Sequence, residues 1–163
     1  MQFRNAFLED LPLIVDIYNS TIPGRMVTAD TEEVTVQDKR NWFDSHDPAK
    51  RPLWIAEEKG HVIGWISYKN FYGRPAYNGT AEVSIYLHSH ARGKGYGKII
   101  LQYCIDQAPA LNLHTLLGFI FSHNEVSKKL FIHAGFAEWG LLKDVAIMDG
   151  NFYSLSIFGL KIK

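Results

Sequence analysis

The sequence contains a single cysteine, Cys104, among its 163 residues. One cysteine excludes a disulfide bond within the chain, and it supplies too few sulfur ligands for a structural zinc site. Cys104 is most simply interpreted as a small buried apolar residue. A chain without disulfides suits a reducing compartment, so we expect the protein to be cytoplasmic.

The sequence also lacks an excess of charge of either sign. Seventeen Lys and Arg residues balance seventeen Asp and Glu residues, which gives a formal net charge of zero. Nucleic acids and anionic membranes usually select a basic surface, so we expect neither as a partner. No apolar run approaches the ~20 residues of a transmembrane helix, and residues 1–10 lack the apolar core of a signal peptide.

Linkers, internal repeats and low-complexity segments are missing as well, which predicts one domain over residues 1–163. The spacing of apolar residues and the positions of Gly and Pro predict alternating strands and helices. The expected strands are residues 2–6, 53–57, 61–68, 81–88, 115–121, 137–148 and 152–161, and the expected helices are residues 9–20, 35–43, 96–107 and 125–133. This order predicts a mixed α/β domain with one main sheet and helices on its faces.

A basic, glycine-rich turn, Arg92-Gly-Lys-Gly-Tyr-Gly97, joins an expected strand to an expected helix. It does not match the Walker A pattern, because Arg92 stands where the first glycine is needed and Ile99 where Ser or Thr is needed. It is also one residue out of register with the dinucleotide pattern Gly-x-Gly-x-x-Gly, and it follows the fourth expected strand rather than the first. Both of these nucleotide-binding motifs are therefore excluded.

The turn does match the pattern Arg/Gln-x-x-Gly-x-Gly/Ala. Glycines let the backbone bend so that successive N–H groups point into one concavity, and the positive end of the following helix adds to that field. With the cations of Arg92, Lys94 and Lys98, this arrangement suits a pyrophosphate. The plain alternative is a flexible turn with solvated lysines.

The same pattern resembles motif A of the GNAT acetyltransferase superfamily. A second segment, Asn124-Glu-Val-Ser-Lys-Lys-Leu-Phe-Ile-His-Ala-Gly-Phe136, is similar to the Asn-x-x-Ser and Gly-Phe motif of that superfamily. Other segments resemble its phosphinothricin and methionine sulfoximine acetyltransferase branch. These are Ile17-Tyr-Asn-Ser-Thr21, Val27-Thr-Ala-Asp30, Phe71-Tyr-Gly-Arg-Pro-Ala-Tyr77 and Ala81-Glu-Val-Ser-Ile-Tyr86. The resemblance covers essentially the whole chain.

The resemblance implies a GNAT-type fold, acetyl-CoA as co-substrate and a homodimer. It assigns the acyl-CoA arm to the strand before the turn, the pyrophosphate to the turn itself, and the flank of the CoA arm to the second motif. The implied cofactor-binding residues are Ile85, Tyr86, Leu87, Arg92, Gly93, Lys94, Gly95, Tyr96, Gly97, Lys98, Asn124 and Ser127.

Glu82 is the candidate general base, because it lies three residues before Ile85 and the resembling branch carries a glutamate there. A carboxylate can accept the proton of an amine directly or through a water, and a backbone N–H of the same strand can stabilise the developing oxyanion. The plain alternative is a strand glutamate that pairs with a cation or faces solvent.

The resemblance also exposes a departure from the family. Many members carry a tyrosine in the second motif that protonates the leaving thiolate, whereas this chain has Phe131. Tyr86, Tyr153 or water could replace that acid, or the thiolate could leave unaided.

Arg74 is the candidate substrate-binding residue, since a guanidinium can hold an α-carboxylate with two parallel hydrogen bonds. It lies in a Gly-Arg-Pro turn near Tyr77, and a solvated surface arginine is the plain alternative. The resemblance alone assigns Thr28 and Asp30 to the polar end of the substrate. His88 and His90 lie two residues apart with no third ligand nearby, so we expect no metal site.

These observations predict an acetyl-CoA-dependent N-acetyltransferase that acts on the α-amine of a small amino-acid-like substrate, of the phosphinothricin or methionine sulfoximine type. Two alternatives stay open. One is the same chemistry on a protein N-terminus, a lysine side chain or a polyamine. The other is a CoA-binding sensor without catalysis, which would keep the glycine turn but would not need Glu82.

Overall fold

The computed structural model describes residues 1–162. Within these residues, four α-helices and seven β-strands follow one another in the predicted order. The strands are β1 (Gln2–Asn5), β2 (Leu53–Glu58), β3 (His61–Asn70), β4 (Thr80–Leu87), β5 (Thr115–Phe121), β6 (Ala137–Met148) and β7 (Asn151–Lys161). The helices are α1 (Leu11–Asn19), α2 (Val36–Asp44), α3 (Tyr96–Gln107) and α4 (Glu125–His133).

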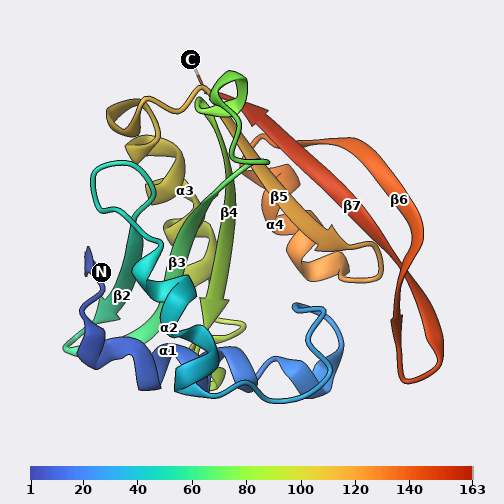
Figure 1. Cartoon of the computed structure of the whole chain (residues 1–163), viewed down its shortest axis with the longest axis horizontal. Coiled ribbons are helices and arrows are strands. Elements are labelled where there is room, and N and C mark those ends of the chain that lie inside the picture. Colours follow the sequence, from blue (N-terminus) through green and yellow to red (C-terminus); the bar gives the residue numbers. More distant parts are fainter. Residues whose placement is uncertain (163) are drawn as a thin grey trace.

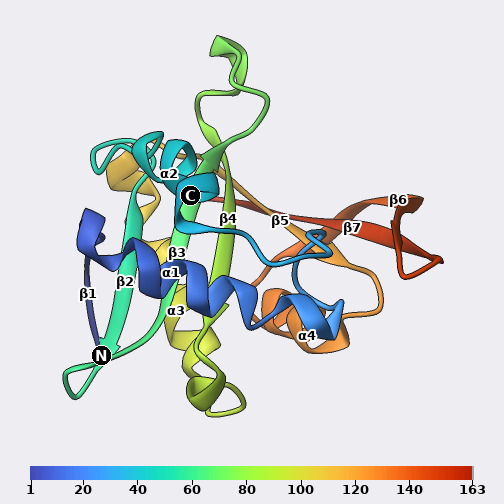
Figure 2. The same cartoon turned by 60° about the horizontal axis from the view of Figure 1, so that its bottom comes forward.

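The strands form one sheet in the order β1-β2-β3-β4-β5-β7-β6. Neighbouring strands are antiparallel except β4 and β5, which are parallel. Helices α1 and α2 cover one face of the sheet and α3 and α4 cover the other (Figures 1 and 2). The predicted mixed α/β architecture is therefore confirmed.

Local sequence signals explain where several elements begin and end. Thr35 caps α2 as predicted: its Oγ1 accepts a hydrogen bond from the Asp38 N–H at 3.1 Å, and the Asp38 carboxylate accepts one from the Thr35 N–H at 2.8 Å. Gly135 follows α4 with a φ of 93°, the left-handed conformation that terminates helices. Asp149 and Gly150, with φ of 51° and 78°, form the predicted hairpin turn between β6 and β7.

Helix α1 begins two residues later than predicted. A short 3-10 turn, Leu8–Asp10, precedes it, and the Asp10 carboxylate accepts a hydrogen bond from the Phe7 N–H at 2.7 Å. Pro12 occupies the first turn of α1, where its missing N–H costs nothing. A side-chain contact therefore stabilises the 3-10 turn, and the spacing of apolar residues could not have predicted that contact.

Each face of the sheet has its own hydrophobic core. On the side of α3 and α4, Ile66, Val83 and Leu116 pack with Ile100 and Phe131. On the side of α1 and α2, buried residues from α1 pack with residues of β2 and β3, among them Ile14, Ile17, Ile55 and Trp65. The two cores hold β3 and β4 rigidly in the centre of the sheet, which is where the site described below is built.

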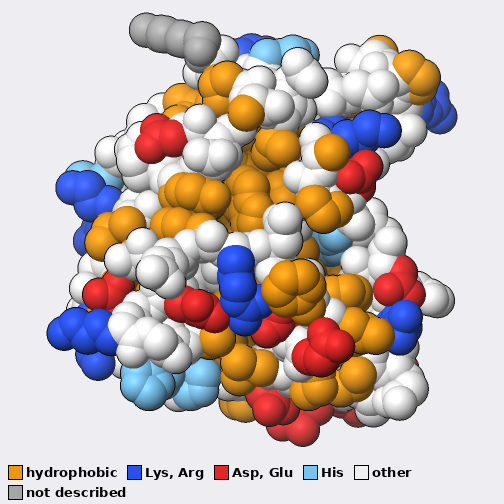
Figure 3. Space-filling model, turned by 90° about the vertical axis from the view of Figure 1, so that its left-hand side faces the viewer, with side chains coloured by type: hydrophobic (Ala, Val, Ile, Leu, Met, Phe, Trp, Pro, Cys, Tyr) orange, Lys and Arg blue, Asp and Glu red, His pale blue; other side chains and the backbone are white. Residues whose placement is uncertain are grey.

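The surface on the side of β1 and β2 carries charges of both signs mixed with hydrophobic side chains (Figure 3). Arg4 forms ion pairs there with Asp10 and Glu57, at 2.7 and 2.9 Å. Mixed signs agree with the zero net charge of the sequence and give this face no basic footprint. In residues 1–162, no helix has the length and apolar character that crossing a lipid bilayer requires.

Candidate functional site

The two central strands β4 and β5 separate from each other along their length. They pair only at their start, through Thr80 with Thr115, Ala81 with Leu116 and Glu82 with Leu117. Beyond Glu82, β4 keeps its pairing with β3 while β5 keeps its pairing with β7, so the sheet splits (Figure 1). Alternate backbone groups on the facing edges are then left free to bind a ligand.

A cleft of about 900 Å³ occupies this opening. It runs from the glycine turn before α3, past the split between β4 and β5, to the face of the sheet beneath α1 and α2. Most of the predicted site residues line it: Thr28, Glu82, Ile85, Tyr86, Leu87, Arg92, Gly93, Gly95, Tyr96, Gly97, Lys98, Asn124 and Ser127. Four predicted residues do not: Asp30, Arg74, Tyr77 and Lys94.

The glycine turn has the backbone geometry of an anion site. Gly93 and Gly95 have φ of 72° and 80°, and a Cβ added at either would meet no atom within 4 Å. The N–H groups of residues 93–97 donate no hydrogen bond to any residue within 1–162. They lie at the N-terminus of the twelve-residue helix α3, where the helix dipole favours negative charge. This geometry suits a pyrophosphate group, and the assignment of the turn to one stays a prediction.

Two hydrogen bonds orient the exposed side chain of Arg92. Its Nε donates to the Leu87 carbonyl oxygen at 3.1 Å, and one Nη donates to Ser20 Oγ at 2.6 Å. The guanidinium thus ties the end of β4 to the end of α1 while still lining the cleft. Lys98, in the first turn of α3, is the other cation that lines this end of the cleft.

Asn124 links the second motif to the opposite wall of the cleft. Its Oδ1 accepts a hydrogen bond from the Ser127 N–H at 3.1 Å and caps α4, while its Nδ2 donates to the Met26 carbonyl oxygen at 2.8 Å. Both ends of this buried amide are therefore used within the chain. Asn124 therefore has a structural role at the cleft wall, and it is also a candidate for contact with the cofactor.

Phe131, at the position of the family tyrosine, is packed into the core on the α3 and α4 face. It is only 6% exposed, and its ring lies against Phe136, with centroids 4.8 Å apart, and above Gly118. Phe131 lines the cleft, but its side chain carries no proton donor. Of the two tyrosines considered as substitutes, Tyr86 lines the cleft and Tyr153 does not.

Three cross-strand pairs of β3 and β4 form the sheet face beneath α1 and α2. Trp65 pairs with Tyr86, Ser67 with Ser84, and Lys69 with Glu82, and all six residues line the cleft. The rings of Trp65 and Tyr86 are stacked with centroids 4.3 Å apart. The face therefore changes along the strands from aromatic to hydroxyl to charged side chains.

Glu82 lies at the charged end of that face. Burial raises the pKa of its carboxyl group above the ordinary value, while the positive charge of Lys69 and a long hydrogen bond from Ser84 Oγ, at 3.5 Å, oppose the rise. No cation within residues 1–162 lies within 4 Å of the carboxylate. A partly buried, unpaired carboxyl with a raised pKa has the properties of a general base.

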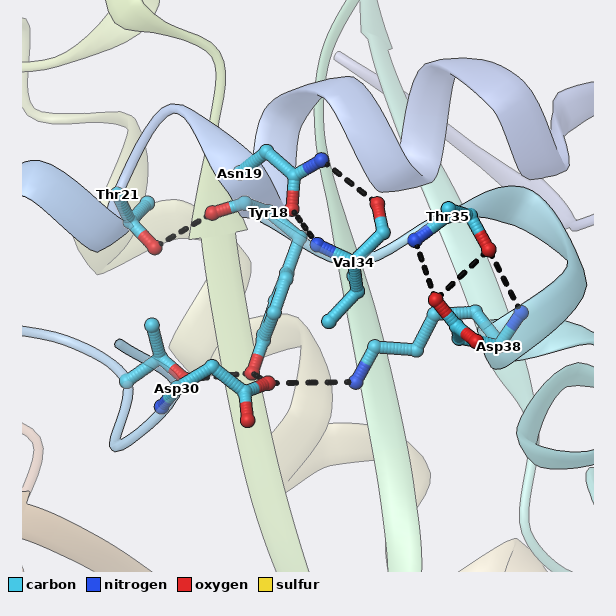
Figure 4. A network of polar contacts seen from close by, with 9 residues as sticks. Tyr18, Asn19, Thr21, Asp30, Val34, Thr35 and Asp38 are labelled. Atoms are coloured by element: carbon cyan, nitrogen blue, oxygen red, sulfur yellow. Dashed lines mark hydrogen bonds and ion pairs between the residues drawn. The ribbon is translucent and has the colours of Figure 1, made fainter. Parts of the chain in front are cut away.

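A polar network covers this end of the cleft (Figure 4). The Tyr18 hydroxyl, from α1, contacts Thr28 Oγ1 and donates a hydrogen bond to the Asp30 carboxylate. Lys39 Nζ, from α2, lies 3.8 Å from the same carboxylate and 4.2 Å from the centre of the Tyr18 ring. Burial and Asp30 raise the pKa of the Tyr18 hydroxyl, so it stays protonated. Asp30 thus organises the cleft wall without lining it.

Arg74 and Tyr77 lie on the β3–β4 connection, which projects from the end of the sheet (Figure 2). Both residues are exposed, and Tyr77 packs against Phe71 with ring centroids 5.4 Å apart. The ten-residue strand β3 runs to Asn70, farther than predicted, and this carries the loop beyond the cleft lining. Within one chain, therefore, the structure does not bring Arg74 together with Glu82 in the cleft.

Sequence reasoning missed two cations at this end of the cleft, Lys39 and Lys69. Counting back from Glu82 across the β3–β4 hairpin would have found Lys69, but only with the register known. Lys39 stands three residues before Trp42 on α2, and from this spacing alone Lys39 would be placed on the solvated side of the helix. Within residues 1–162, no group of three or more His, Cys, Asp or Glu side chains could hold a metal ion.

The comparisons with known proteins agree with this geometry. Residues 13–136 match the family described as Acetyltransferase (GNAT) family. The chain is 53% identical over 163 residues to a Bacillus subtilis protein provisionally named phosphinothricin acetyltransferase YwnH, covering 99% of both chains. It is 31% identical over 160 residues to the L-methionine sulfoximine/L-methionine sulfone acetyltransferase of Pseudomonas paraeruginosa, covering 98% of this chain and 93% of that protein.

Solved structures give the same result. The crystal structure of a provisionally named phosphinothricin N-acetyltransferase is 52% identical, covers 99% of this chain and 98% of its own, and superposes with a TM-score of 0.96. A GNAT superfamily phosphinothricin acetyltransferase from Sinorhizobium meliloti, in complex with acetyl-CoA, is 27% identical and covers 99% of this chain and 88% of its own, with a TM-score of 0.91.

Proposed function

The chain belongs to the GNAT acetyltransferase family, whose co-substrate is acetyl-CoA, and on that premise we propose that it acetylates the α-amine of a small amino-acid-like acceptor. The leading acceptors are phosphinothricin, methionine sulfoximine and methionine sulfone, after which its relatives are named. The observation that carries the proposal is the continuous cleft that joins the glycine turn to Glu82 through the split between β4 and β5.

Acetyl-CoA would be held at one end of this cleft. The pyrophosphate binds the N–H groups of residues 93–97 with Arg92 and Lys98 beside them, and the pantetheine arm runs along Ile85, Tyr86 and Leu87. Ser127, with Asn124 behind it, flanks the arm from the start of α4. Lys94 lies outside the cleft lining, so we assign it only a long-range electrostatic part.

Glu82 performs the proton transfer in the proposed mechanism. The acceptor enters from the side of α1 and α2, and its ammonium group loses a proton to the Glu82 carboxylate, directly or through one water. The amine nitrogen then forms a bond to the thioester carbonyl carbon as the carbon–sulfur bond breaks, and the CoA thiolate leaves. The nitrogen gives its second proton to the departing thiolate or to water, which leaves the neutral amide. A free backbone N–H of β4 near Ile85 stabilises the negative charge on the carbonyl oxygen.

The CoA thiolate can leave without a general acid. This suits a chain that has Phe131 where many family members have the tyrosine that protonates the thiolate. Tyr86 is the one tyrosine of the two considered that lines the cleft, and burial raises the pKa of its hydroxyl, so the proton is present. Tyr86 is therefore the side chain that could return a proton to sulfur; otherwise the thiolate leaves with its charge.

The experiment that tests the proposal is release of free CoA from acetyl-CoA across a panel of acceptors. The panel contains phosphinothricin, methionine sulfoximine, methionine sulfone, common amino acids, polyamines and short peptides. We expect turnover with the first three. Turnover confined to peptides or polyamines would move the acceptor class to the first alternative, and acetyl-CoA binding without any turnover would favour the CoA sensor.

We also propose that the protein is a homodimer that buries the β6–β7 hairpin. This hairpin extends away from the body of the fold (Figure 1) and exposes Leu141, Val145, Ile147 and Phe152, each between 55% and 65% exposed. A patch of this kind on a folded domain usually marks a protein interface. Light scattering of the wild type should give twice the mass of one chain. The double variant Ile147→Ser with Phe152→Ser should have the mass of one chain. The control Leu8→Ser, which changes an exposed leucine outside the hairpin, should leave the dimer intact.

A further inference from the structure

The cations that line the cleft fall into two groups. Arg92 and Lys98 belong to the glycine turn, where the pyrophosphate is assigned. Lys39 and Lys69 lie at the other end, on α2 and β3, together with Glu82. The second pair lies away from the glycine turn, so we ask which other ligand group it could bind.

Lys69 is a cation without an acidic partner. Its side chain forms no hydrogen bond and no ion pair within 4 Å to any residue of the described chain, although Glu82 stands directly opposite on β4. The two side chains share one face of the sheet, and side chains at such paired positions have their Cβ atoms about 5 Å apart. Both side chains line the cleft, and Lys69 is exposed, so its ammonium group is accessible to a ligand there.

Lys39 approaches the same place from above. Its ammonium group lies over the Tyr18 ring and 5.8 Å from the centre of the Trp42 ring, and its contact with Asp30 is loose, at 3.8 Å. Burial lowers the pKa of this ammonium group, and the nearby charge of Lys69 lowers it further while Asp30 opposes both effects. Two ammonium groups that repel each other across a cleft are stabilised when an anion binds between them.

We infer that Lys39 and Lys69 form an anion subsite that receives the carboxylate of the acceptor. In an α-amino acid the amine and the carboxylate are separated by one carbon atom, so a carboxylate at Lys69 brings the amine to the neighbouring Glu82. The subsite would also repel polyamines and lysine side chains. This inference rests on the proposed function, and it replaces Arg74 with two lysines as the carboxylate-binding residues.

The test compares an acceptor with its carboxamide. Calorimetric titration measures the affinity of methionine sulfoximine and of methionine sulfoximine amide for the protein saturated with CoA, which forms a complex without turnover. We expect the wild type to bind the acid more tightly. Lys39→Gln and Lys69→Gln should each weaken binding of the acid by roughly 10- to 100-fold, because each removes a charge-assisted hydrogen bond, and should leave the amide nearly unchanged.

Matched variants separate this effect from a loss of folding. Lys69→Arg keeps the charge and should keep the preference for the acid, and Lys50→Gln, at an exposed lysine on the α2–β2 connection, should behave as wild type. Melting curves and CoA affinity should be the same for every variant. The inference is overturned if the double variant Lys39→Gln with Lys69→Gln still prefers the acid. It is also overturned if Arg74→Ala removes the preference, or if the wild type binds neither compound.

The outcome for this subsite can be separated from that of the proposed function. If the wild type prefers the acid through Lys39 and Lys69 but acetylates no acceptor, the subsite stands and the catalytic proposal fails. If the wild type acetylates methionine sulfoximine and the lysine variants keep its KM, catalysis stands and the subsite is wrong.

Discussion

Lys69 and Glu82 stand opposite each other on the paired strands β3 and β4, on the sheet face that lines the acceptor end of the cleft. The lysine charge lowers the pKa of the glutamate against the raising effect of burial. The pair is too far apart to form an ion pair, so the carboxylate stays free to take a proton. In the proposed mechanism, this relationship couples acceptor recognition to the protonation of Glu82.

The first prediction concerns the pH dependence of kcat/KM in a Lys69→Gln protein. Removing the positive charge leaves burial less opposed, so the pKa of Glu82 rises and its carboxylate form appears only at higher pH. The acidic limb of the profile should therefore move to higher pH. Lys69→Arg should leave the limb in place, and a downward move in Lys69→Gln would contradict the assignment of that limb to Glu82.

The second prediction is that Glu82→Gln loses acetyl transfer but gains stability. Folding raises the pKa of the Glu82 carboxyl, so the folded state favours the protonated form and the ionised form opposes folding. The protein therefore has its full stability below the pKa of Glu82 in the unfolded chain. It loses part of that stability as pH rises through the pKa of Glu82 in the folded chain. At pH 7 the amide should therefore raise Tm by roughly 1 to 3 °C. Calorimetry should find unchanged acetyl-CoA affinity, while turnover falls about 100-fold or more. Full activity of this variant would eliminate Glu82 as the base.

The third prediction separates backbone strain from cofactor binding. Gly95 and Gly60 have nearly the same left-handed φ, 80° and 77°, and an added Cβ meets nothing at either. Alanine should therefore cost a similar 1 to 2 kcal/mol, roughly, in the free energy of unfolding at both positions. Only Gly95→Ala should also weaken CoA binding, because only its turn presents N–H groups to the pyrophosphate. Equal CoA affinity in the two variants would argue against the turn as the pyrophosphate site.

The fold was largely predictable because its signals are local, and the glycine turn could be located for the same reason. Alternation predicted the strand at residues 81–88 and a continuous apolar run predicted the strand at residues 115–121, while Thr35, Gly135 and Asp149-Gly150 marked termini that the structure confirms. The glycine turn needs only consecutive residues to form its concavity, so its sequence carries its geometry.

The acceptor end was less predictable because it depends on register and on contacts between distant segments. Lys69 meets Glu82 only through the pairing of β3 with β4, and Lys39 reaches the cleft only because α2 packs on the same face. Arg74 attracted attention for its chemistry, yet its place is set by how far β3 extends before the chain turns back. Neither spacing nor composition encodes these relationships.

The fourth prediction tests the close packing of α4 on β5. A Cβ at Gly118 would lie 2.3 Å from Phe131 Cε1, so the ring must move if the glycine is replaced. Gly118→Ala should lower the free energy of unfolding by about 1 to 3 kcal/mol and disturb the cleft wall that Phe131 lines. Gly140→Ala, whose Cβ would lie 3.9 Å from its nearest neighbour, should change stability far less in the same urea titration. Comparable losses in both would show that strand flexibility, and not contact with Phe131, sets the cost.

The last prediction concerns stability in acid. Arg4 donates two hydrogen bonds to Asp10, at 2.7 and 2.8 Å, and with the Phe7 N–H these hold the pKa of the Asp10 carboxyl below its ordinary value. A depressed pKa stabilises the folded state above the unfolded value of about 3.9, and this contribution is lost as pH falls through the folded pKa. Asp10→Asn should therefore cost about 1 to 2 kcal/mol at pH 7 and flatten the decline of stability in acid.

Urea unfolding between pH 3 and 7 measures this directly. Asp16→Asn is the matched control, because Asp16 is exposed on α1 and its side chain forms no hydrogen bond or ion pair within residues 1–162. The control should keep both the stability at pH 7 and the wild-type decline in acid. If Asp10→Asn keeps the wild-type decline too, then other carboxylates carry the acid sensitivity and the ion pair that joins β1 to the start of α1 contributes little.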